Sequence, residues 1–393
     1  MINSYKLVAD IWDKKERDAM LKVIKSNNFT MGNQVLEFEE KLKNVFKIKN
    51  AIVVNSGSSA NLISISALRI KLFNEKKNQK NEIILPKIAW STTLSPLFYN
   101  GFKPIFVDVG KDFNIDCKQI KKFVTKKTAA IFTVNLLGEP SDLISLKEIC
   151  KNNKIHLIED NCESMGATLN GKFCGTFGLA GTLSFFFSHH ITTIEGGAIL
   201  SNDNDFADIC RSLRAHGWIR ELSKKSKLLP KKINPLKKMF YFPLPGFNLR
   251  PTEFVGALGK VQLKKLFNFV KIRKKNLDYF KKKLELVDDI LMQKTSEGNS
   301  SFSFGMYLKK KSHKNYKKLI LFLKKNNIEA RPIAGGNLEK QPMCKYFSNN
   351  KKNKRDYATE IDNYGFMIGN SPINLFKQID YFINRLLFFF NKI

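Results

Sequence analysis

Short apolar runs alternate along the first two hundred residues with longer segments in which apolar residues recur every three or four positions. The short runs are rich in β-branched residues and predict strands at 51–54, 82–86, 103–107, 129–134, 155–158 and 196–200. The longer segments predict helices at 10–26, 35–46, 141–152 and 205–214, and one that ends near residue 70. Regular alternation of strands and helices is typical of an α/β fold with a mostly parallel sheet.

The pattern changes after residue 222. A segment rich in Lys and Pro, 223–245, lacks periodicity and is interpreted as a linker or flexible loop. A long helical region follows Gly246–Glu253, and then come a strand at 302–308, a helix at 316–326, a strand at 328–331 and further helices. We therefore expect a large domain, 1–250, and a small C-terminal α+β domain, 251–393.

Composition limits the classes of partner. The chain has 67 Lys and Arg against 35 Asp and Glu, a formal net charge of +32, but the lysines are spread in diffuse runs. This spread argues against a nucleic-acid-binding protein, although the positive field would attract an anionic substrate. Neither a signal peptide nor an apolar run of membrane-spanning length is recognisable, so we expect a cytoplasmic protein with no membrane association.

Two turns after predicted strands have the residues of a ligand site. Asn55–Asn61 is rich in Ser and Gly between a strand and a helix, which favours phosphate binding by backbone N–H groups, although such turns also cap ordinary helices. Glu159, Asp160 and Glu163 follow another strand. Ligands of open α/β sheets bind at the carboxyl ends of strands, but a single carboxylate there is more often a helix cap.

A third turn contains adjacent histidines. In Ser184–Gly197 an apolar, strand-like run is followed by His189, His190 and a polar turn that ends in Gly-Gly. Histidines at the mouth of a cleft are compatible with a general base, a metal pair or a structural role. The six cysteines include no CxxC pair, so their spacing indicates neither a zinc nor an iron–sulfur site.

Taken together, the Ser-Gly-Ser turn, Trp90, Glu159-Asp160, the turn at 188–197 and Gly246–Glu253 resemble the sugar aminotransferases of the DegT/DnrJ/EryC1/StrS family. The resemblance spans essentially the whole chain. It implies the fold-type I fold of pyridoxal-phosphate enzymes, an α/β fold with a large domain around a mixed, mostly parallel sheet and a small C-terminal α+β domain.

The resemblance also implies roles for individual residues. His189 occupies the position of the family's lysine, which binds the cofactor covalently and carries protons, and His190 is expected to be its structural neighbour. A histidine can move protons near neutral pH but is not a primary amine, so the cofactor would rest as free pyridoxamine phosphate. The resemblance further implies that Gly57, Ser58 and Ser184 bind the cofactor phosphate, and that Asn248 reaches the phosphate from the neighbouring subunit of a homodimer with shared active sites. It implies that Trp90 stacks on the pyridine ring, that Asp160 pairs with the pyridine nitrogen and that Glu163 contacts the cofactor or glutamate. His216, Arg250 and Arg331 would bind glutamate or substrate anions.

The expected reaction follows from the histidine. With pyridoxal 5′-phosphate and pyridoxamine 5′-phosphate as cofactor forms, the resemblance implies removal of the C3 hydroxyl of a 4-keto-6-deoxy nucleotide sugar, with a GDP-linked sugar as substrate and L-glutamate as amino donor. No iron–sulfur cluster is expected, because Cys344 alone lies beyond Cys210. A nucleotide-sugar 4-aminotransferase is the alternative, although Lys87, near Trp90, lies on the wrong strand to bind the cofactor. A second alternative is a non-catalytic regulatory protein on the same fold.

Overall fold

The computed structural model describes residues 4–347 and 356–392. In chain order its strands and helices are α1 (Lys14–Ser26), α2 (Asn33–Phe46), β1 (Asn50–Val54), α3 (Gly57–Asn74), β2 (Glu82–Pro86), α4 (Ser91–Tyr99), β3 (Lys103–Val107), α5 (Cys117–Ile120), β4 (Thr128–Val134), α6 (Leu143–Asn153), β5 (His156–Asp160), β6 (Thr168–Leu169), β7 (Lys172–Phe173), β8 (Ala180–Ser184), β9 (Gly197–Ser201), α7 (Asn204–Arg214), α8 (Pro235–Lys238), α9 (Glu253–Leu263), α10 (Leu266–Leu284), β10 (Ile290–Met292), β11 (Ser303–Leu308), α11 (Tyr316–Lys325), β12 (Ala330–Arg331), α12 (Tyr357–Tyr364), β13 (Gly365–Gly369) and α13 (Phe376–Asn391).

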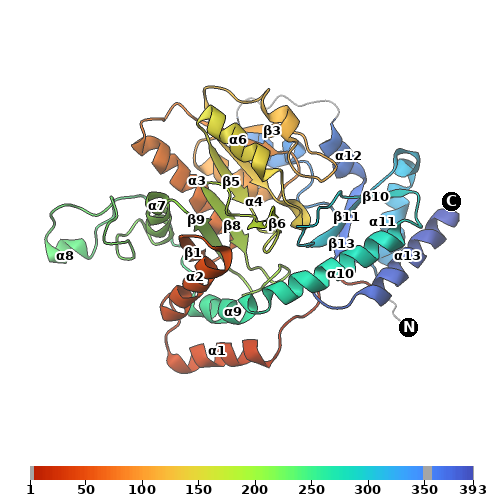
Figure 1. Ribbon diagram of the computed structural model, residues 1–393, viewed down its shortest axis with the longest axis horizontal. Helices are drawn as coiled ribbons and strands as arrows, with labels where there is room; N and C mark the ends of the chain where they lie inside the picture. Colours follow the sequence, from red (N-terminus) through yellow and green to blue (C-terminus); the bar gives the residue numbers. More distant parts are fainter. Residues whose placement is uncertain (1–3, 348–355, 393) are drawn as a thin grey trace.

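A seven-stranded sheet forms the centre of the larger part of the molecule (Figure 1). Its strand order is β1-β9-β8-β5-β4-β2-β3, and β9 runs antiparallel to both of its neighbours while the other pairs are parallel. Most strand residues are apolar and buried, which is the pattern of a sheet covered on both faces. Ile83 and Leu85 join the core beneath α3 and α7, and Ile84, between them, joins the core beneath α6. The result is a three-layer α/β arrangement.

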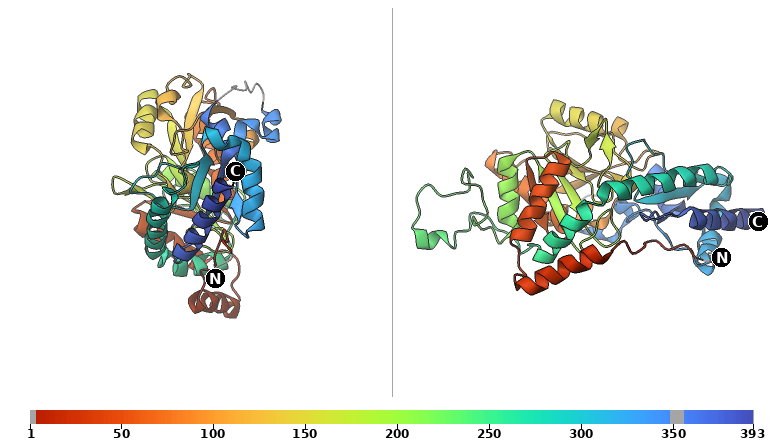
Figure 2. Two further views of the ribbon diagram at one scale, coloured as in Figure 1. Left: turned by 90° about the vertical axis from the view of Figure 1, so that its right-hand side faces the viewer. Right: turned by 60° about the horizontal axis from the view of Figure 1, so that its bottom comes forward.

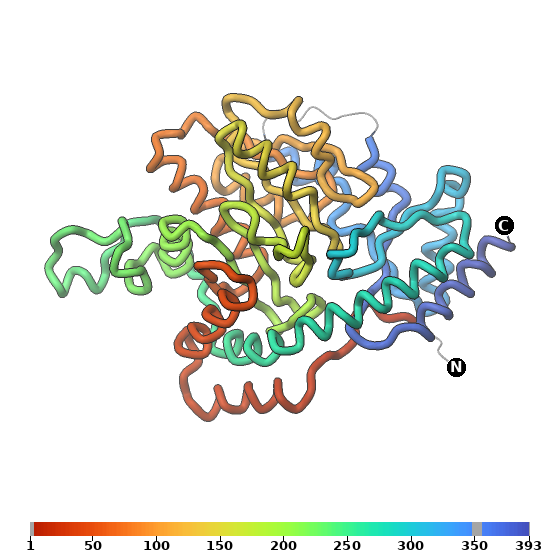
Figure 3. Tube along the Cα trace, in the orientation of Figure 1, coloured from red at the N-terminus to blue at the C-terminus, as the bar shows by residue number. Residues whose placement is uncertain are grey.

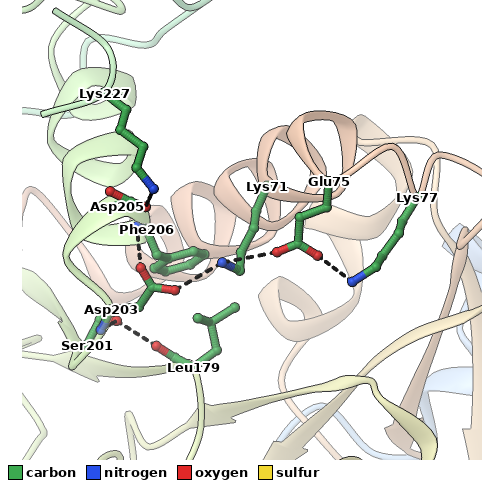
Figure 4. A network of polar contacts seen from close by, with 9 residues as sticks. All are labelled: Lys71, Glu75, Lys77, Leu179, Ser201, Asp203, Asp205, Phe206 and Lys227. Carbon is green, nitrogen blue, oxygen red and sulfur yellow. Dashed lines mark hydrogen bonds and ion pairs between the residues drawn. The ribbon is translucent and has the colours of Figure 1, made fainter.

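Helix α3 begins immediately after β1 and is fixed at both ends. Ser56 caps its N-terminus by accepting a hydrogen bond from the Ser59 N–H at 3.1 Å. Near its C-terminus, Lys71 Nζ donates to Asp203 Oδ2 at 3.0 Å, and Asp203 also accepts from the Phe206 N–H and so caps α7 (Figure 4). One carboxylate therefore ties α3 to α7 on the same face of the sheet.

The smaller part of the molecule contains the antiparallel sheet β10-β11-β13-β12, which shares a core with α10, α11 and α13. The long helix α10 runs from the larger part to the smaller part, and both chain termini lie at the smaller part (Figure 2). Tyr5 is fully buried in this second core, and its hydroxyl donates to the Gly369 carbonyl at 2.8 Å. The start of the chain is thus part of the C-terminal core.

Core packing crosses the expected domain boundary at residue 250 in both directions. Tyr5 belongs to the core of the smaller part, as described above. Val255 and Leu263 of α9 belong to a core cluster that also contains Val35 and Phe38 of α2. The physical reason is that α9 is apolar on the side that faces α2 and the sheet. The division of the chain at residue 250 stays a prediction.

The segment between α7 and α9 projects from the body of the molecule and contains the short helix α8 (Figure 3). Apolar side chains on it face outward: Leu236 is 76% exposed and Phe240 is 66% exposed. Trp218 stacks on Phe240 and Phe242, with ring centroids 5.6 Å and 5.7 Å apart. In the described ranges, no helix has both the length and the apolar character needed to cross a membrane.

Candidate active site

A cavity of about 370 Å³ lies where the carboxyl ends of β5 and β8 and the N-terminus of α3 meet the smaller part of the molecule. Parallel strands end at the same edge of a sheet, so residues distant in sequence are brought together there. The wall formed by the larger part includes Gly57, Ser58, Trp90, Asp160, Glu163, Ser184 and His189, and the opposite wall includes Arg273, Phe302, Ser303 and Met367.

The Ser-Gly-Ser turn forms a cradle for an anion. Gly57 is the first residue of α3, and a Cβ at this position would lie 2.6 Å from Ser184 Cβ, so only glycine fits. The first N–H groups of a helix have no acceptor within the helix, and they lie at the positive end of its dipole. The hydroxyls of Ser58 and Ser184 also border the cavity. This end of the cavity can bind a phosphate group through backbone and hydroxyl donors.

Asp160 is the last residue of β5 and presents a fixed carboxylate to the cavity. Its Oδ2 accepts hydrogen bonds from Asn61 Nδ2 and Thr93 Oγ1, each at 2.8 Å, and the side chain is 4% exposed. Its neighbour Glu159 points the other way and accepts the N–H groups of Gly175, Phe177 and Gly178. Consecutive side chains of a strand point to opposite faces. Asp160 therefore faces the cavity, whereas Glu159 holds the loop at residues 175–178.

Trp90 and Glu163 supply the aromatic and ionisable parts of the same wall. Trp90 is 55% exposed and borders the cavity, so it is not a core aromatic residue. Glu163 Oε2 accepts the Leu137 N–H at 3.1 Å. Burial and the nearby Asp160 raise the pKa of Glu163 to about 7, although the hydrogen bond from Leu137 opposes the shift. Glu163 can therefore exchange a proton near neutral pH.

The double histidine divides into one cavity residue and one core residue. β8 ends at Ser184, and the chain then leaves the sheet, so Phe186 and Phe187 are 44% and 42% exposed instead of continuing the apolar strand. His189 borders the cavity, and its ring lies 5.1 Å from the ring of Phe302. His190 is fully buried, and its Nε2 lies 3.2 Å from the Ser300 carbonyl.

Both histidines are neutral at physiological pH. Burial, together with the charge of Arg273, lowers the pKa of His189 to about 4, and the same causes lower the pKa of His190 well below its usual value. His189 Nδ1 is enclosed and has no hydrogen-bond partner in the described ranges, which leaves Nε2 as the ring nitrogen open to the cavity. A neutral imidazole with one accessible nitrogen is suited to accept a proton.

Four of the predicted site residues lie outside this cavity. Asn248 pairs with Ala215 in an isolated bridge, and Arg250 Nε donates to Asn248 Oδ1 at 3.2 Å. His216 is exposed, with a backbone φ of 62°, and Arg331 is exposed on β12. These residues are not among those that line the cavity within this chain.

Lys87 is not a cavity residue either. It is 1% exposed, its Nζ lies 2.7 Å from Glu339 Oε2, and it also pairs with Asp356. Burial opposes its charge, but the hydrogen bonds to Asp356 and Glu339 outweigh burial and raise the pKa of the ammonium group. A lysine held in this way is not available as a nucleophile.

The sequence reasoning missed Arg273, Phe302 and Asn61. Arg273 lies on the helix α10, whose lysines belong to one of the diffuse runs noted in the sequence. The available signal was its register, because Arg273 falls on the stripe formed by Leu266, Phe269, Leu277 and Phe280. Within the part of the chain that the structure describes, no group of three His, Cys, Asp or Glu residues could hold a metal ion.

Comparison with known proteins identifies the family. Residues 10–372 match the sequence profile of the DegT/DnrJ/EryC1/StrS aminotransferase family. The chain is 43% identical to GDP-4-keto-6-deoxy-D-mannose 3-dehydratase of Escherichia coli O55:H7, over 97% of this chain and 98% of that protein.

Two solved structures of GDP-4-keto-6-deoxymannose-3-dehydratase, one with bound GDP-perosamine and one with a trapped PLP-glutamate geminal diamine, are 42% identical to this chain. Each has a TM-score of 0.92 and covers 98% of this chain and 100% of its own. The expected fold-type I fold is confirmed by this similarity and by the mixed sheet. The expected family is confirmed as well, and the chain belongs to the DegT/DnrJ/EryC1/StrS aminotransferase family.

Proposed function

We propose that this chain is a pyridoxamine-phosphate-dependent 3-dehydratase, which removes the C3 hydroxyl of a GDP-linked 4-keto-6-deoxyhexose and uses L-glutamate as amino donor. The observation that carries the proposal is the position of His189. It borders the cavity together with Asp160, Trp90 and the anion cradle. The family resemblance implies that His189 occupies the position at which the family's aminotransferases use a lysine. A histidine can transfer a proton there but cannot bind the cofactor covalently as lysine does.

The cavity has the groups that this cofactor requires. Gly57, Ser58 and Ser184 would bind its phosphate, since all three line the same end of the cavity. Glycine at position 57 keeps this cradle open, because a side chain there would fill it. Asp160 would pair with the ring nitrogen, and the exposed face of Trp90 would stack on the ring. Glu163 would contact the cofactor or glutamate. When bound, pyridoxamine phosphate supplies a reactive amine and an electron-accepting ring, which is the chemistry needed to expel a hydroxyl beside a ketone.

His189 is the residue that moves protons in this proposal. Its neutral ring, with Nε2 open to the cavity, would accept a proton during loss of the hydroxyl and again during the reaction with glutamate. His190 would hold the turn in place through its contact with the Ser300 carbonyl. Support for the GDP-linked substrate and for glutamate comes from the related structures with bound GDP-perosamine and a PLP-glutamate adduct.

We also propose a homodimer with shared active sites, in which Asn248 contributes to the cavity of the neighbouring subunit. The exposed apolar side chains of the segment around α8 and the position of Asn248 outside its own cavity support this arrangement. We further propose that His216, Arg250 and Arg331 bind glutamate or substrate anions. The cysteines form no disulfide in the described ranges, which fits the reducing environment of the cytoplasm, and we propose the cytoplasm as the site of action.

The shared site can be tested by mixing two inactive variants, His189→Asn and Asn248→Ala. In a mixed dimer, one site would contain the intact His189 of one chain and the intact Asn248 of the other. Half of randomly mixed dimers are heterodimers with one intact site, so about a quarter of the wild-type activity should return. No recovery in a verified mixed dimer would show that both residues act within one chain.

The reaction is tested by mass spectrometry of the products formed from pyridoxal phosphate, excess L-glutamate and GDP-4-keto-6-deoxymannose. A keto sugar that lacks one oxygen, with release of ammonia, is the expected result. Formation of an amino sugar would establish the aminotransferase alternative instead. If GDP-4-keto-6-deoxymannose and other nucleotide sugars all remain unchanged, the assignment as a dehydratase is contradicted and a non-catalytic role is favoured. The control is the same reaction without pyridoxal phosphate.

A further inference from the structure

The ring of His189 lacks the hydrogen bond that usually orients a catalytic histidine. A histidine that acts as a base is normally held through its second ring nitrogen, which bonds to a carboxylate or a backbone carbonyl. Nδ1 of His189 is enclosed but has no hydrogen-bond partner among the described residues. The last side-chain torsion of histidine has a broad, roughly two-fold profile, so the ring can turn unless its neighbours prevent it. The direction of Nε2 must therefore be set by the groups that pack against the ring.

Two aromatic rings pack against His189. Phe186, in the same turn, has its ring centroid 5.9 Å from that of His189, and the two planes meet at 81°. Phe302, from the opposite wall of the cavity, lies closer, with the centroids 5.1 Å apart and the planes at 45°. The ring of Phe302 also lies 5.9 Å from that of His190. Phe302 therefore contacts both histidines, whereas Phe186 is 44% exposed and contacts only the first.

The backbone of Phe302 is tied to both parts of the molecule. Its N–H donates to the carbonyl of Leu137, which follows β4 in the larger part, at 3.0 Å. Its carbonyl accepts a hydrogen bond from Nη1 of Arg273, on α10, also at 3.0 Å. A backbone held from two sides cannot shift without breaking one of these bonds. The residue from which the ring projects toward His189 is therefore fixed in place.

The two preceding residues are held as firmly. Ser300 donates its N–H to the Gly138 carbonyl at 2.9 Å, and its own carbonyl lies 3.2 Å from Nε2 of His190. At Gly138, whose φ is 94°, a Cβ would lie only 2.4 Å from the Ser301 nitrogen, so glycine permits this close approach. The segment 300–302 thus packs on the loop after β4 and on the turn that contains the histidines.

We propose that Phe302 is a positioning residue, whose ring keeps the imidazole of His189 in the orientation that directs Nε2 into the cavity. Its ring occupies the space into which the imidazole would otherwise turn. The inference rests on the proposed function, in which His189 moves the protons, and adds the residue that aims the base. Proton transfer depends steeply on this aim, because a misplacement of about 1 Å can lower a rate about 100-fold.

The test follows the conversion of the pyridoxal to the pyridoxamine form by absorbance, in a single turnover of the holoenzyme with saturating L-glutamate. Phe302→Ala should lower this rate about 10-fold to 100-fold, because the imidazole gains room to turn. The Kd for pyridoxal phosphate should stay within about threefold of the wild-type value, since the proposed cofactor contacts lie on the opposite wall. The rate should fall in the order Phe, Leu, Val, Ala at position 302, as more of the space beside His189 is opened. The Leu and Val variants carry the same test if the Ala variant does not fold.

Phe187→Ala is the matched control. Phe187 lies in the same turn as His189 and is 42% exposed. It does not border the cavity, and among the described residues its ring contacts neither histidine. Removal of this ring should therefore leave the rate at the wild-type value. A loss in Phe187→Ala as large as that in Phe302→Ala would contradict a specific role of Phe302.

A deuterium isotope effect separates the aim of the base from general damage. L-Glutamate with deuterium on its α-carbon reports the step in which that proton is transferred. If the base is misdirected in Phe302→Ala, this step is the slow one, so the isotope effect should equal or exceed that of the wild type. An isotope effect that falls toward one would overturn the inference, as would an undiminished rate.

His189→Asn distinguishes failure of this inference from failure of the proposed function. An undiminished reaction with glutamate in His189→Asn, or no reaction in the wild type, would refute the proposed base and the role of Phe302 together. A slow His189→Asn beside an unimpaired Phe302→Ala would refute only the role of Phe302. The sugar is not used in these measurements, so failure of the dehydration reaction would be recognised separately.

Discussion

Arg273 and His189 border the same cavity, and the charge of Arg273 adds to burial in lowering the pKa of His189 to about 4. The two residues come from opposite walls, one on the strand-end turn after β8 and the other on α10. The base is therefore neutral in the folded protein at every pH at which the protein is expected to work.

The first prediction concerns stability in acid. The pKa of His189 is lowered from 6.5 to about 4 in the folded state, so between these values the unfolded chain binds more protons. This contribution to stability is complete above pH 6.5 and is lost as the pH falls toward 4. For this residue the loss at pH 5 is about 2 kcal/mol. Urea unfolding can be measured at pH 7.5 and pH 5.0. The decrease in the free energy of unfolding between these two pH values should be about 2 kcal/mol smaller in His189→Asn than in the wild type. Equal decreases in the two proteins would contradict the lowered pKa of His189.

The second prediction separates the two histidines. His189→Asn should lower the rate of dehydration by a factor of about 10² to 10⁴, the usual contribution of a general base. His190→Asn is the matched control, because His190 is fully buried and contacts the Ser300 carbonyl. His190→Asn should lower the free energy of unfolding. The dehydration rate, measured in the fraction that remains folded, should change much less than in His189→Asn. Undiminished dehydration in His189→Asn would refute the assignment of the base.

The parts of the site that follow strands could be predicted from the sequence. Gly57, Ser58, Asp160 and Ser184 lie within a few residues of an apolar run, and parallel strands end at a common edge, so local pattern and topology give their position.

Arg273 could not be placed in this way. It belongs to a helix far along the chain, surrounded by lysines that are solvated, and only the packing of α10 against the smaller sheet turns it toward the cavity. The domain boundary is difficult for the same reason, since Tyr5 and α9 each pack on the part of the molecule that is remote in sequence. Contacts between distant segments depend on tertiary packing, which periodicity does not encode.

The third prediction tests the partner of the cofactor ring. Asp160→Asn keeps the shape of the side chain and an oxygen that can accept from Asn61 and Thr93, but it removes the negative charge. A protonated ring nitrogen would lose its ion pair, so the Kd for pyridoxal phosphate, measured by absorbance titration, should rise at least about tenfold. Glu163→Gln serves as the matched control in the same wall and should raise this Kd less. An unchanged Kd in Asp160→Asn would exclude the pairing.

The fourth prediction concerns the contact between α3 and α7. Asp203 caps α7 and accepts from Lys71 at the far end of the helix whose first residue is Gly57 (Figure 4). Asp203→Ala should lower the free energy of unfolding by about 1–2 kcal/mol, because the cap and the partly exposed ion pair are both lost. Asp203→Asn keeps a capping oxygen and should cost less than half as much. Equal effects of the two variants in urea unfolding would show that the ion pair, not the cap, is the main contribution.

The last prediction decides whether Lys87 can replace the missing lysine. Its Nζ is held by Glu339 and Asp356 in the interior, and Lys87 does not border the cavity. Borohydride reduction of the protein loaded with pyridoxal phosphate, followed by peptide mass spectrometry, should therefore yield no cofactor adduct at Lys87. In addition, Lys87→Met should lower the free energy of unfolding by about 3–5 kcal/mol, because two buried carboxylates lose their cation. An adduct at Lys87, or a Lys87→Met protein that is fully stable but inactive, would favour the aminotransferase over the dehydratase. Loss of stability without an adduct would instead leave His189 as the residue that defines the chemistry of this site.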